Sequence, residues 1–253
     1  MNRSDASGNP GPERLPHAVL DGPSRVFKAR KIIDLIGAER FGRTRSVLEV
    51  GCGSGVIAST LSELGGDSLE VCAVDVVDNR MTSSGFRFQL VQGTTLPYES
   101  QVFDLVITNH VIEHVGDQAE QLRHLGEIHR VLRPDGCVYL AVPNKWRIVE
   151  PHYRLPFLSW LPQRTADRYV RSLRRGTHYD CLPLDRKTAE RLFSREAFQF
   201  ENLTTRAIRS TLRIEYPDSG LARLASRYLP EWALKMMLPV VSTMIYRLVK
   251  KQV

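Results

Sequence analysis

The sequence predicts an α/β protein with a doubly wound, mostly parallel β-sheet. Short β-rich runs alternate with helical patterns up to residue 144, and the run over 102–108 is almost continuously apolar, as in a strand covered on both faces. The chain has 253 residues, 42% hydrophobic and 25% charged, which fits a globular protein and excludes a disordered chain. Four scattered cysteines without a CxxC pair predict neither a disulfide framework nor a zinc site.

The elements expected in the first part of the chain follow from their apolar periods. Helices are expected over 56–64 and 117–132, where apolar residues recur on one helical face. Strands are expected over 46–50, 70–74, 86–91, 102–108 and 137–142. Ligands of such sheets bind outside the carboxyl ends of the strands, so the residues that follow each strand are the candidates for function.

The pattern changes after residue 142. Residues 143–183 are rich in proline and aromatic residues and too long for a connecting loop, so an inserted cap is expected there. Four arginines of the cap recur at spacings of four, three and four, which predicts one basic helical face: Arg164, Arg168, Arg171 and Arg175. A helix over 185–195 with Asp185 as its N-cap and closing strands over 198–205 and 210–216 are expected next.

The two ends of the chain are expected to differ from the middle. Residues 1–22 are predicted to form a disordered tail, and the polar, Gly- and Pro-rich composition of 1–14 shows no signal peptide. The main domain is expected over 23–216, with a C-terminal helical segment over 217–253. The apolar stretch 229–249 is interrupted by Lys235 and Pro239, which favours a membrane-interfacial helix or a core helix over a membrane span.

The net charge of +7 is unevenly distributed. Residues 1–144 carry 14 Lys+Arg and 18 Asp+Glu, whereas residues 145–253 carry 21 and 10. The basic half predicts either an anionic partner (phosphate, a membrane surface or nucleic acid) or a solvated basic face. Free thiols and the absence of a signal sequence predict a cytoplasmic protein, with peripheral contact at the inner face of the membrane as an alternative.

A glycine-rich loop follows the first strand, in the segment VLEVGCGSG over 47–55. Glycines allow a sharp turn and close approach to a ligand, and the next helix points free N–H groups at the same place. The GxGxG spacing, with Glu49 on the strand before it, differs from the dinucleotide fingerprint. Asp75 ends the second strand, where a carboxylate can accept both hydroxyls of a ribose; a loop or N-cap carboxylate is the alternative.

Four ordered segments carry a resemblance to a known family: VLEVGCGSG, VDVVDNR, LPYESQVFDLVITNHVIEHV and EIHRVLRPDGCVYLAVPN. Over residues 26–144 the chain resembles class I S-adenosylmethionine-dependent methyltransferases, which have a Rossmann-like sheet. It is most similar to the small-molecule branch, which includes ubiquinone-biosynthesis O-methyltransferases and enzymes of glycan and lipid modification. The resemblance implies S-adenosylmethionine as cofactor and methyl transfer to a small or lipid-linked acceptor, with an oxygen nucleophile expected.

The resemblance also implies roles for individual residues. Glu49 should face the methionine amino group, Asp75 should hold the ribose, and Val76 should lie beside the adenine ring. Thr94 stands where the family often has an aspartate and would accept a weaker hydrogen bond from adenine. Asn109 should flank the methionine sulfur. The remaining cofactor-binding residues are expected in the glycine-rich loop and after the third strand: Gly51, Cys52, Gly53, Ser54, Gly55 and Thr95.

A general base is expected if the acceptor is a hydroxyl. Its candidates are His110, His114, His152 and His178. His114 is nearest to the expected methyl position and is the predicted base; the alternative is a structural histidine packed against Glu113. These two residues alone do not predict a metal site.

Other functions stay open at this point. The isoelectric point near 9.4 would suit a nucleic-acid methyltransferase, but the fourth strand leads into Asn109-His110-Val111-Ile112 and not into the (N/D)PP(Y/F) motif used on a flipped base. Nucleic acid is therefore not the expected partner. A non-catalytic scaffold is opposed by the intact glycine loop and Asp75, and a nicotinamide-linked oxidoreductase is the rival with a similar fold.

Overall fold

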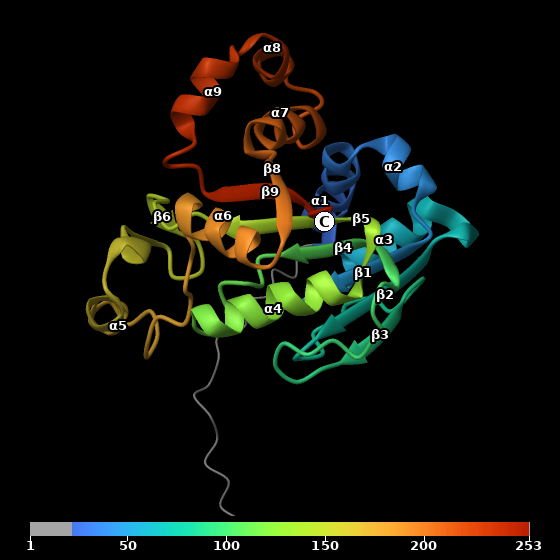
Figure 1. Cartoon of the computed structure of the whole chain (residues 1–253). Coiled ribbons are helices and arrows are strands. Elements are labelled where there is room, and N and C mark those ends of the chain that lie inside the picture. Colours follow the sequence, from blue (N-terminus) through green and yellow to red (C-terminus); the bar gives the residue numbers. More distant parts are fainter. Residues whose placement is uncertain (1–21, 253) are drawn as a thin grey trace, which may run out of the picture.

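The computed structural model describes residues 22–252 and shows a central sheet with helices on both faces (Figure 1). Its strand order is β3-β2-β1-β4-β5-β9-β8. Neighbours from β3 to β5 pair in parallel, and β9 is antiparallel to both β5 and β8. The bounds are β1 (Ser46–Val50), β2 (Glu70–Asp75), β3 (Arg87–Leu90), β4 (Phe103–Asn109), β5 (Leu132–Pro143), β8 (Phe198–Asn202) and β9 (Thr243–Lys250). The predicted fold class is confirmed.

Two apolar cores cover the two faces of the sheet. Because strand side chains alternate between faces, Leu105 and Ile107 of β4 join one core while Val106 joins the other. The first core lies under α1 (Gly22–Ile36), α3 (Val56–Gly65) and α7 (Thr204–Ile214). The second lies under α4 (Gln118–Val131) and α6 (Arg186–Arg195), whose N-cap is Asp185 as predicted. The shorter helices are α2 (Ala38–Arg43), η1 (Gly66–Ser68), α8 (Gly220–Tyr228) and α9 (Glu231–Met237).

The strand predicted over 210–216 is wrong, because residues 210–214 belong to helix α7. The strand predicted over 198–205 is correct only up to Asn202, since α7 begins at Thr204. Thr204, Ala207 and Ser210 recur every third residue and form the buried face of α7. The Thr204 hydroxyl accepts a hydrogen bond from the backbone N–H of Ile245 in β9 at 3.1 Å. Small side chains on this face allow the helix to lie directly on the sheet.

The helical segment predicted over 217–253 is correct only in its first part, α8 and α9. Residues 243–250 instead form β9, which is inserted between β5 and β8. Its central residues Met244, Ile245 and Tyr246 are buried, because successive side chains enter the two opposite cores. Tertiary pairing therefore overrides the helical reading of this apolar stretch.

Helices long and apolar enough to cross a membrane are absent from residues 22–252. The predicted tail over 1–22 lies outside the described residues except for Gly22, which begins α1.

Residues 143–183 leave the sheet after β5 as the expected cap. The cap contains β6 (Val149–Glu150), β7 (Leu155–Pro156), η2 (Leu158–Trp160) and α5 (Gln163–Ser172). It has a small apolar core of its own, formed by Tyr153, Leu155, Leu158, Ala166, Val170, Tyr179 and Cys181. The Leu182 N–H donates to the Glu113 carbonyl at 2.8 Å, which places the base of the cap beside the chain that follows β4.

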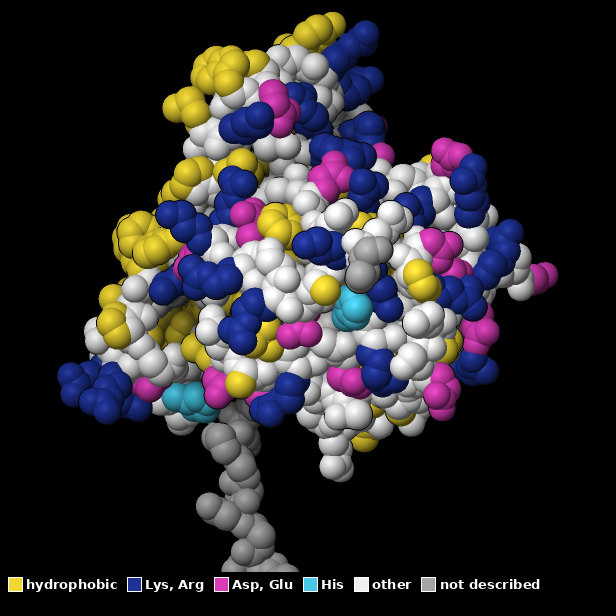
Figure 2. All heavy atoms as spheres, in the orientation of Figure 1, with side chains coloured by type: hydrophobic (Ala, Val, Ile, Leu, Met, Phe, Trp, Pro, Cys, Tyr) yellow, Lys and Arg dark blue, Asp and Glu magenta, His cyan; other side chains and the backbone are white. Residues whose placement is uncertain are grey.

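The basic face predicted for the cap is only partly formed. Arg164, Arg168 and Arg171 are exposed on α5, but α5 ends at Ser172. Arg175 lies past that end, after Arg174 takes a left-handed φ of 53°. Figure 2 shows Lys and Arg side chains gathered at the outer end of the cap.

Candidate functional site

The glycine-rich loop joins β1 to α3 in a conformation that requires glycine. Gly51, Gly53 and Gly55 have φ values of 74°, 52° and 73°, a region that other residues rarely adopt. A Cβ atom on Gly51 would lie 2.4 Å from Cγ2 of Val111, and one on Gly55 would lie 2.8 Å from the carbonyl oxygen of Thr82. The loop is therefore packed too closely for a side chain at either position.

Asp75 fixes this loop to the end of β2. Its Oδ2 accepts a hydrogen bond from the Gly53 N–H at 2.8 Å, and its Oδ1 accepts one from the Val76 N–H at 2.7 Å and a longer one from the Val77 N–H at 3.4 Å. A carboxylate has about four acceptor positions, so Asp75 keeps capacity for a further donor, chiefly at Oδ2. Asp75 therefore serves the loop structurally and still presents acceptors to a ligand.

A cavity of about 330 Å³ lies at the carboxyl ends of β1 and β2, and the chain after β3 and β4 completes its wall. Such a volume suits a small-molecule ligand. Five of the predicted site residues line it: Gly51, Asp75, Val76, Thr94 and His114. The other predicted residues do not line it: Glu49, Cys52, Gly53, Ser54, Gly55, Thr95 and Asn109.

The cavity wall also contains residues that the sequence did not single out. Val91, Leu96 and Val111 supply apolar surface, and His124 enters from α4. Val111 is the second residue after β4, so its position after a strand was a usable signal. The sequence did not indicate that His124 lines the cavity, because its side chain is buried on the inner face of a helix.

Two polar atoms on β1 and β4 lack a hydrogen-bond partner among the described residues: Glu49 Oε2 and Asn109 Oδ1. The Glu49 side chain is buried, and this burial raises its pKa to about 8. A buried acceptor without a donor is unfavourable, and a bound ammonium group would satisfy it. The residues present therefore fit a positively charged donor at the carboxyl ends of β1 and β4, beside the cavity that these two side chains do not line.

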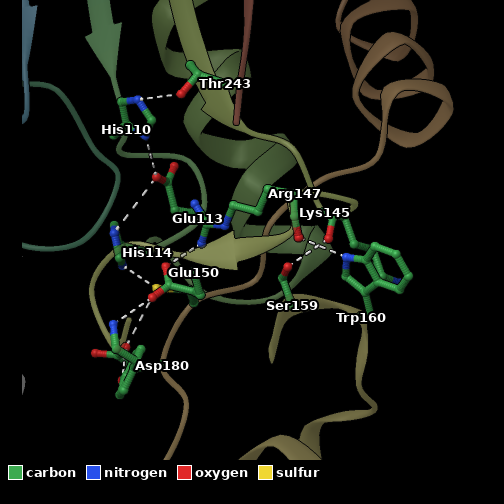
Figure 3. Close-up of polar contacts among 12 residues, drawn as sticks. His110, Glu113, His114, Lys145, Arg147, Glu150, Ser159, Trp160, Asp180 and Thr243 are labelled. Carbon is green, nitrogen blue, oxygen red and sulfur yellow. Dashed lines mark hydrogen bonds and ion pairs between the residues drawn. The ribbon is translucent and has the colours of Figure 1, made fainter. Parts of the chain in front are cut away.

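Three polar residues follow β4 on the other side of the site (Figure 3). Nδ1 of His110 lies 3.3 Å from Oε1 of Glu113, and Nε2 of His114 lies 3.9 Å from the same oxygen. Glu113 is buried, which alone would raise its pKa, but the hydrogen bond and charge of His110 and the charge of His114 outweigh burial and lower the pKa. Glu113 is therefore a carboxylate at neutral pH, beside a histidine that lines the cavity.

The other histidines of this region are less suited to act on a ligand. Burial lowers the pKa of His124 to about 4, so its imidazole is neutral at pH 7; its Nε2 lies 3.3 Å from Oγ1 of Thr108. The His152 ring packs edge-on against His114 at 5.8 Å between centroids, and His178 contacts the Thr177 hydroxyl. Neither His152 nor His178 lines the cavity. Within residues 22–252, no three His, Cys, Asp or Glu side chains are grouped to hold a metal ion.

Comparison with known proteins decides between the possible classes of ligand-binding fold. A family model described as a methyltransferase domain matches residues 48–140, from β1 through the glycine-rich loop to β5. Residues 48–140 therefore carry the sequence of a methyltransferase domain. The cofactor of such a domain is S-adenosylmethionine.

Curated relatives of this methyltransferase domain cover part of the chain. The ubiquinone biosynthesis O-methyltransferase of Azorhizobium caulinodans is 30% identical over 49% of this chain and 52% of its own. The malonyl-[acyl-carrier protein] O-methyltransferase of Salmonella typhimurium is 26% identical over 66% of each chain. The chain thus spans about half to two thirds of the length of these relatives.

Solved structures share the fold of the methyltransferase domain at low sequence identity. The plantazolicin methyltransferase BamL, in complex with a triazolic desmethylPZN analog and SAH, has a TM-score of 0.56 at 13% identity, with 90% of this chain and 85% of that chain covered. The [4+2]-cyclase SpnF has a TM-score of 0.53 at 17% identity, with 94% and 85% covered. One fold therefore supports different reactions, and the reaction has to be argued from the site.

Proposed function

We propose that this protein transfers the methyl group of S-adenosylmethionine to an oxygen atom of a small or lipid-linked acceptor. The observation that carries the proposal is one cavity with the glycine-rich loop and Asp75 on one side and His114 on the other. The curated relatives named as O-methyltransferases support an oxygen nucleophile and favour a small acceptor over nucleic acid.

The proposed cofactor contacts follow from the site. Asp75 would accept the ribose hydroxyls, Val76 and Thr94 would border the adenine ring, and Glu49 with Asn109 would receive the methionine end. The cofactor supplies a methyl group bonded to a positively charged sulfur. This bond already makes the methyl carbon a strong electrophile. The protein's part is to align the acceptor oxygen with that methyl, and alignment alone can contribute several kcal/mol.

Glu49 gives this assignment a test that does not need the acceptor. With a pKa of about 8 the free protein holds Glu49 mostly protonated at pH 7, and an ammonium group beside it favours the carboxylate. Binding of S-adenosylmethionine at pH 7 is therefore expected to release nearly one proton, which calorimetry in buffers of different ionisation enthalpy measures. Glu49→Gln should bind more weakly and release none. Proton release that is equal in both proteins would contradict the assignment.

His114 is the proposed general base. It would accept the proton of the acceptor hydroxyl, and the imidazolium so formed would lie 3.9 Å from the Glu113 carboxylate, which stabilises its charge. Glu113 acts through His114 and is a positioning residue.

His114→Gln is expected to lower kcat about 100-fold at pH 7, with no change in cofactor affinity. The loss should shrink as pH rises, because a phenolic acceptor then ionises without help. The measurement is the pH profile of kcat, and His178→Gln, outside the cavity, is the matched control. A His114→Gln profile that parallels the parent's would assign His114 a structural role only.

A transfer screen with labelled cofactor tests the reaction itself. Extracts are separated into lipid, glycan and nucleic-acid fractions and incubated with the protein. Label is expected in an organic-soluble or other small acceptor. Label confined to nucleic acid, or cofactor binding without transfer to any fraction, would refute the proposal in favour of an RNA methyltransferase or a scaffold.

A further inference from the structure

The cap exposes an aromatic cluster of Trp146, Phe157 and Trp160. Between 40% and 48% of the surface of each residue is accessible. The Trp160 ring contacts the Trp146 ring at 5.7 Å and the Phe157 ring at 4.9 Å between centroids. The indole N–H of Trp160 donates to the Arg147 carbonyl at 2.9 Å, so its polar atom is satisfied within the protein. The cluster is therefore a fixed structure that presents apolar surface outward.

Phe157 is held in this cluster against its backbone preference. Its φ of 56° is in the left-handed region, which is unfavourable for a bulky residue. The Phe157 N–H donates to the Ile148 carbonyl at 2.7 Å, and its carbonyl accepts from the Trp160 N–H at 3.1 Å. Strain that is maintained by surrounding bonds often marks a functional position. Here it keeps an aromatic ring at the surface.

A second apolar group lies on α9 and the residues after it. Trp232 and Met236 are 66% and 72% exposed, and Met237 and Val240 are exposed beside them. Asn144, the first residue after β5, joins the two groups. Its Nδ2 donates to the Pro239 carbonyl at 2.9 Å, and its Oδ1 accepts from the Trp146 N–H at 3.0 Å. We call Trp146, Phe157, Trp160, Trp232 and Met236 the aromatic edge.

Positive charge accompanies the aromatic edge. Lys235 is exposed between Trp232 and Met236, and the Lys145 ammonium lies 5.5 Å from the centre of the Trp146 ring. The half of the chain that contains the edge, residues 145–253, has 21 Lys+Arg and 10 Asp+Glu. Figure 2 shows hydrophobic side chains along the left side of the view, with Lys and Arg side chains among them.

From this combination we infer that the aromatic edge docks on the surface of an anionic phospholipid bilayer. Tryptophan rings are favoured at the boundary between headgroups and acyl chains, and basic side chains are attracted to anionic headgroups. A buried protein interface would instead be depleted of lysine. The inference goes beyond the proposed methyl transfer and does not require it, although a lipid-linked acceptor would be met on the same surface.

Vesicle flotation tests the inference with the full-length protein. Truncation is unsuitable because it would remove β9 from the sheet, so substitutions on the edge are used: Trp146→Ser with Phe157→Ser, and separately Trp232→Ser with Met236→Ser. The matched control is Leu64→Ser with Leu90→Ser, which changes two similarly exposed apolar residues on α3 and β3. Calorimetric binding of S-adenosylmethionine shows that each variant is folded.

The parent and the control are expected to float with vesicles of phosphatidylglycerol and phosphatidylcholine and to float far less with phosphatidylcholine alone. Each edge variant should lose at least tenfold in vesicle-bound fraction while it still binds the cofactor. The inference is overturned if the parent stays in the soluble fraction with both vesicles, or if the edge variants float as well as the control. It is also overturned if light scattering shows a dimer that the edge substitutions dissociate, because a second copy then covers the edge.

Discussion

Asp75→Ala is expected to lower the affinity for S-adenosylmethionine about 150-fold. Two hydrogen bonds from ribose hydroxyls to a carboxylate contribute about 1.5 kcal/mol each, and their loss gives about 3 kcal/mol. The substitution also removes the acceptor of the Gly53 N–H, so the glycine-rich loop loses its tie to β2. Calorimetric titration measures the change.

Asp78→Ala is the matched control for this substitution. Asp78 lies three residues further along the chain, is paired with Arg80 at 2.8 Å and does not line the cavity. The control should bind the cofactor as the parent does. An Asp75→Ala protein with the parent's affinity and a normal melting curve would show that Asp75 only supports the loop, and the ribose assignment would fail.

Gly51 provides an independent approach to the same site. A valine there would place its Cβ where Val111 now lies and would force an unfavourable φ, so Gly51→Val should disturb the wall between the loop and the chain after β4. The sequence indicated a need for glycine at this point. The contact with Val111, 60 residues away in the chain, could be seen only in the structure.

The parts of the fold that sequence predicted well are those with a strong local signal. The strand expected over 46–50 is β1 with the same bounds, because an apolar run there stops at a glycine loop. The helix predicted from 56 begins at Val56. Their order also placed Gly51 and Asp75 at one edge of the sheet, since parallel strands bring their carboxyl ends together.

The elements that were predicted wrongly are those whose conformation depends on contacts with residues far away in the chain. Leu212, Ile214 and Tyr216 alternate as in a strand, but the buried face of α7 consists of small residues such as Ala207, which carry little apolar signal. Likewise, the apolar stretch after 229 contains both a helix and β9, and only pairing with β5 and β8 decides where the strand begins.

The side of the site that is proposed to receive the acceptor shows the same difference between local and distant contacts. Glu113 and His114 are neighbours in sequence, so their interaction could be expected. The approach of Cys181, whose Sγ lies 3.7 Å from Nδ1 of His114, depends on the return of the chain from the cap. The cap therefore completes the surroundings of the proposed base, and its stability bears on transfer as well as on folding.

Arg147→Ala is expected to destabilise the cap by about 3–5 kcal/mol. The Arg147 and Glu150 side chains are 3% and 0% exposed and form an ion pair, and Glu150 also accepts the Tyr153 N–H at 2.7 Å. Removal of the arginine leaves a buried carboxylate without its cation. Because the cap has its own apolar core, hydrogen exchange should rise over 145–183 while β1 and β4 keep their protection.

Two further variants of the protein serve as controls for this prediction. Arg43→Ala breaks the exposed pair with Glu39, whose side chains are 79% and 80% accessible, and should cost at most about 0.5 kcal/mol. Arg147→Met with Glu150→Leu removes both charges and should be more stable than Arg147→Ala, since no buried charge remains.

In Arg147→Ala, cofactor binding should persist while methyl transfer falls, because the loop and Asp75 belong to the sheet whereas the cap surrounds His114. Equal exchange in Arg147→Ala and Arg43→Ala would mean that the buried pair does not hold the cap, and a joint loss of cofactor binding and transfer would mean that the cap and the sheet unfold as one unit.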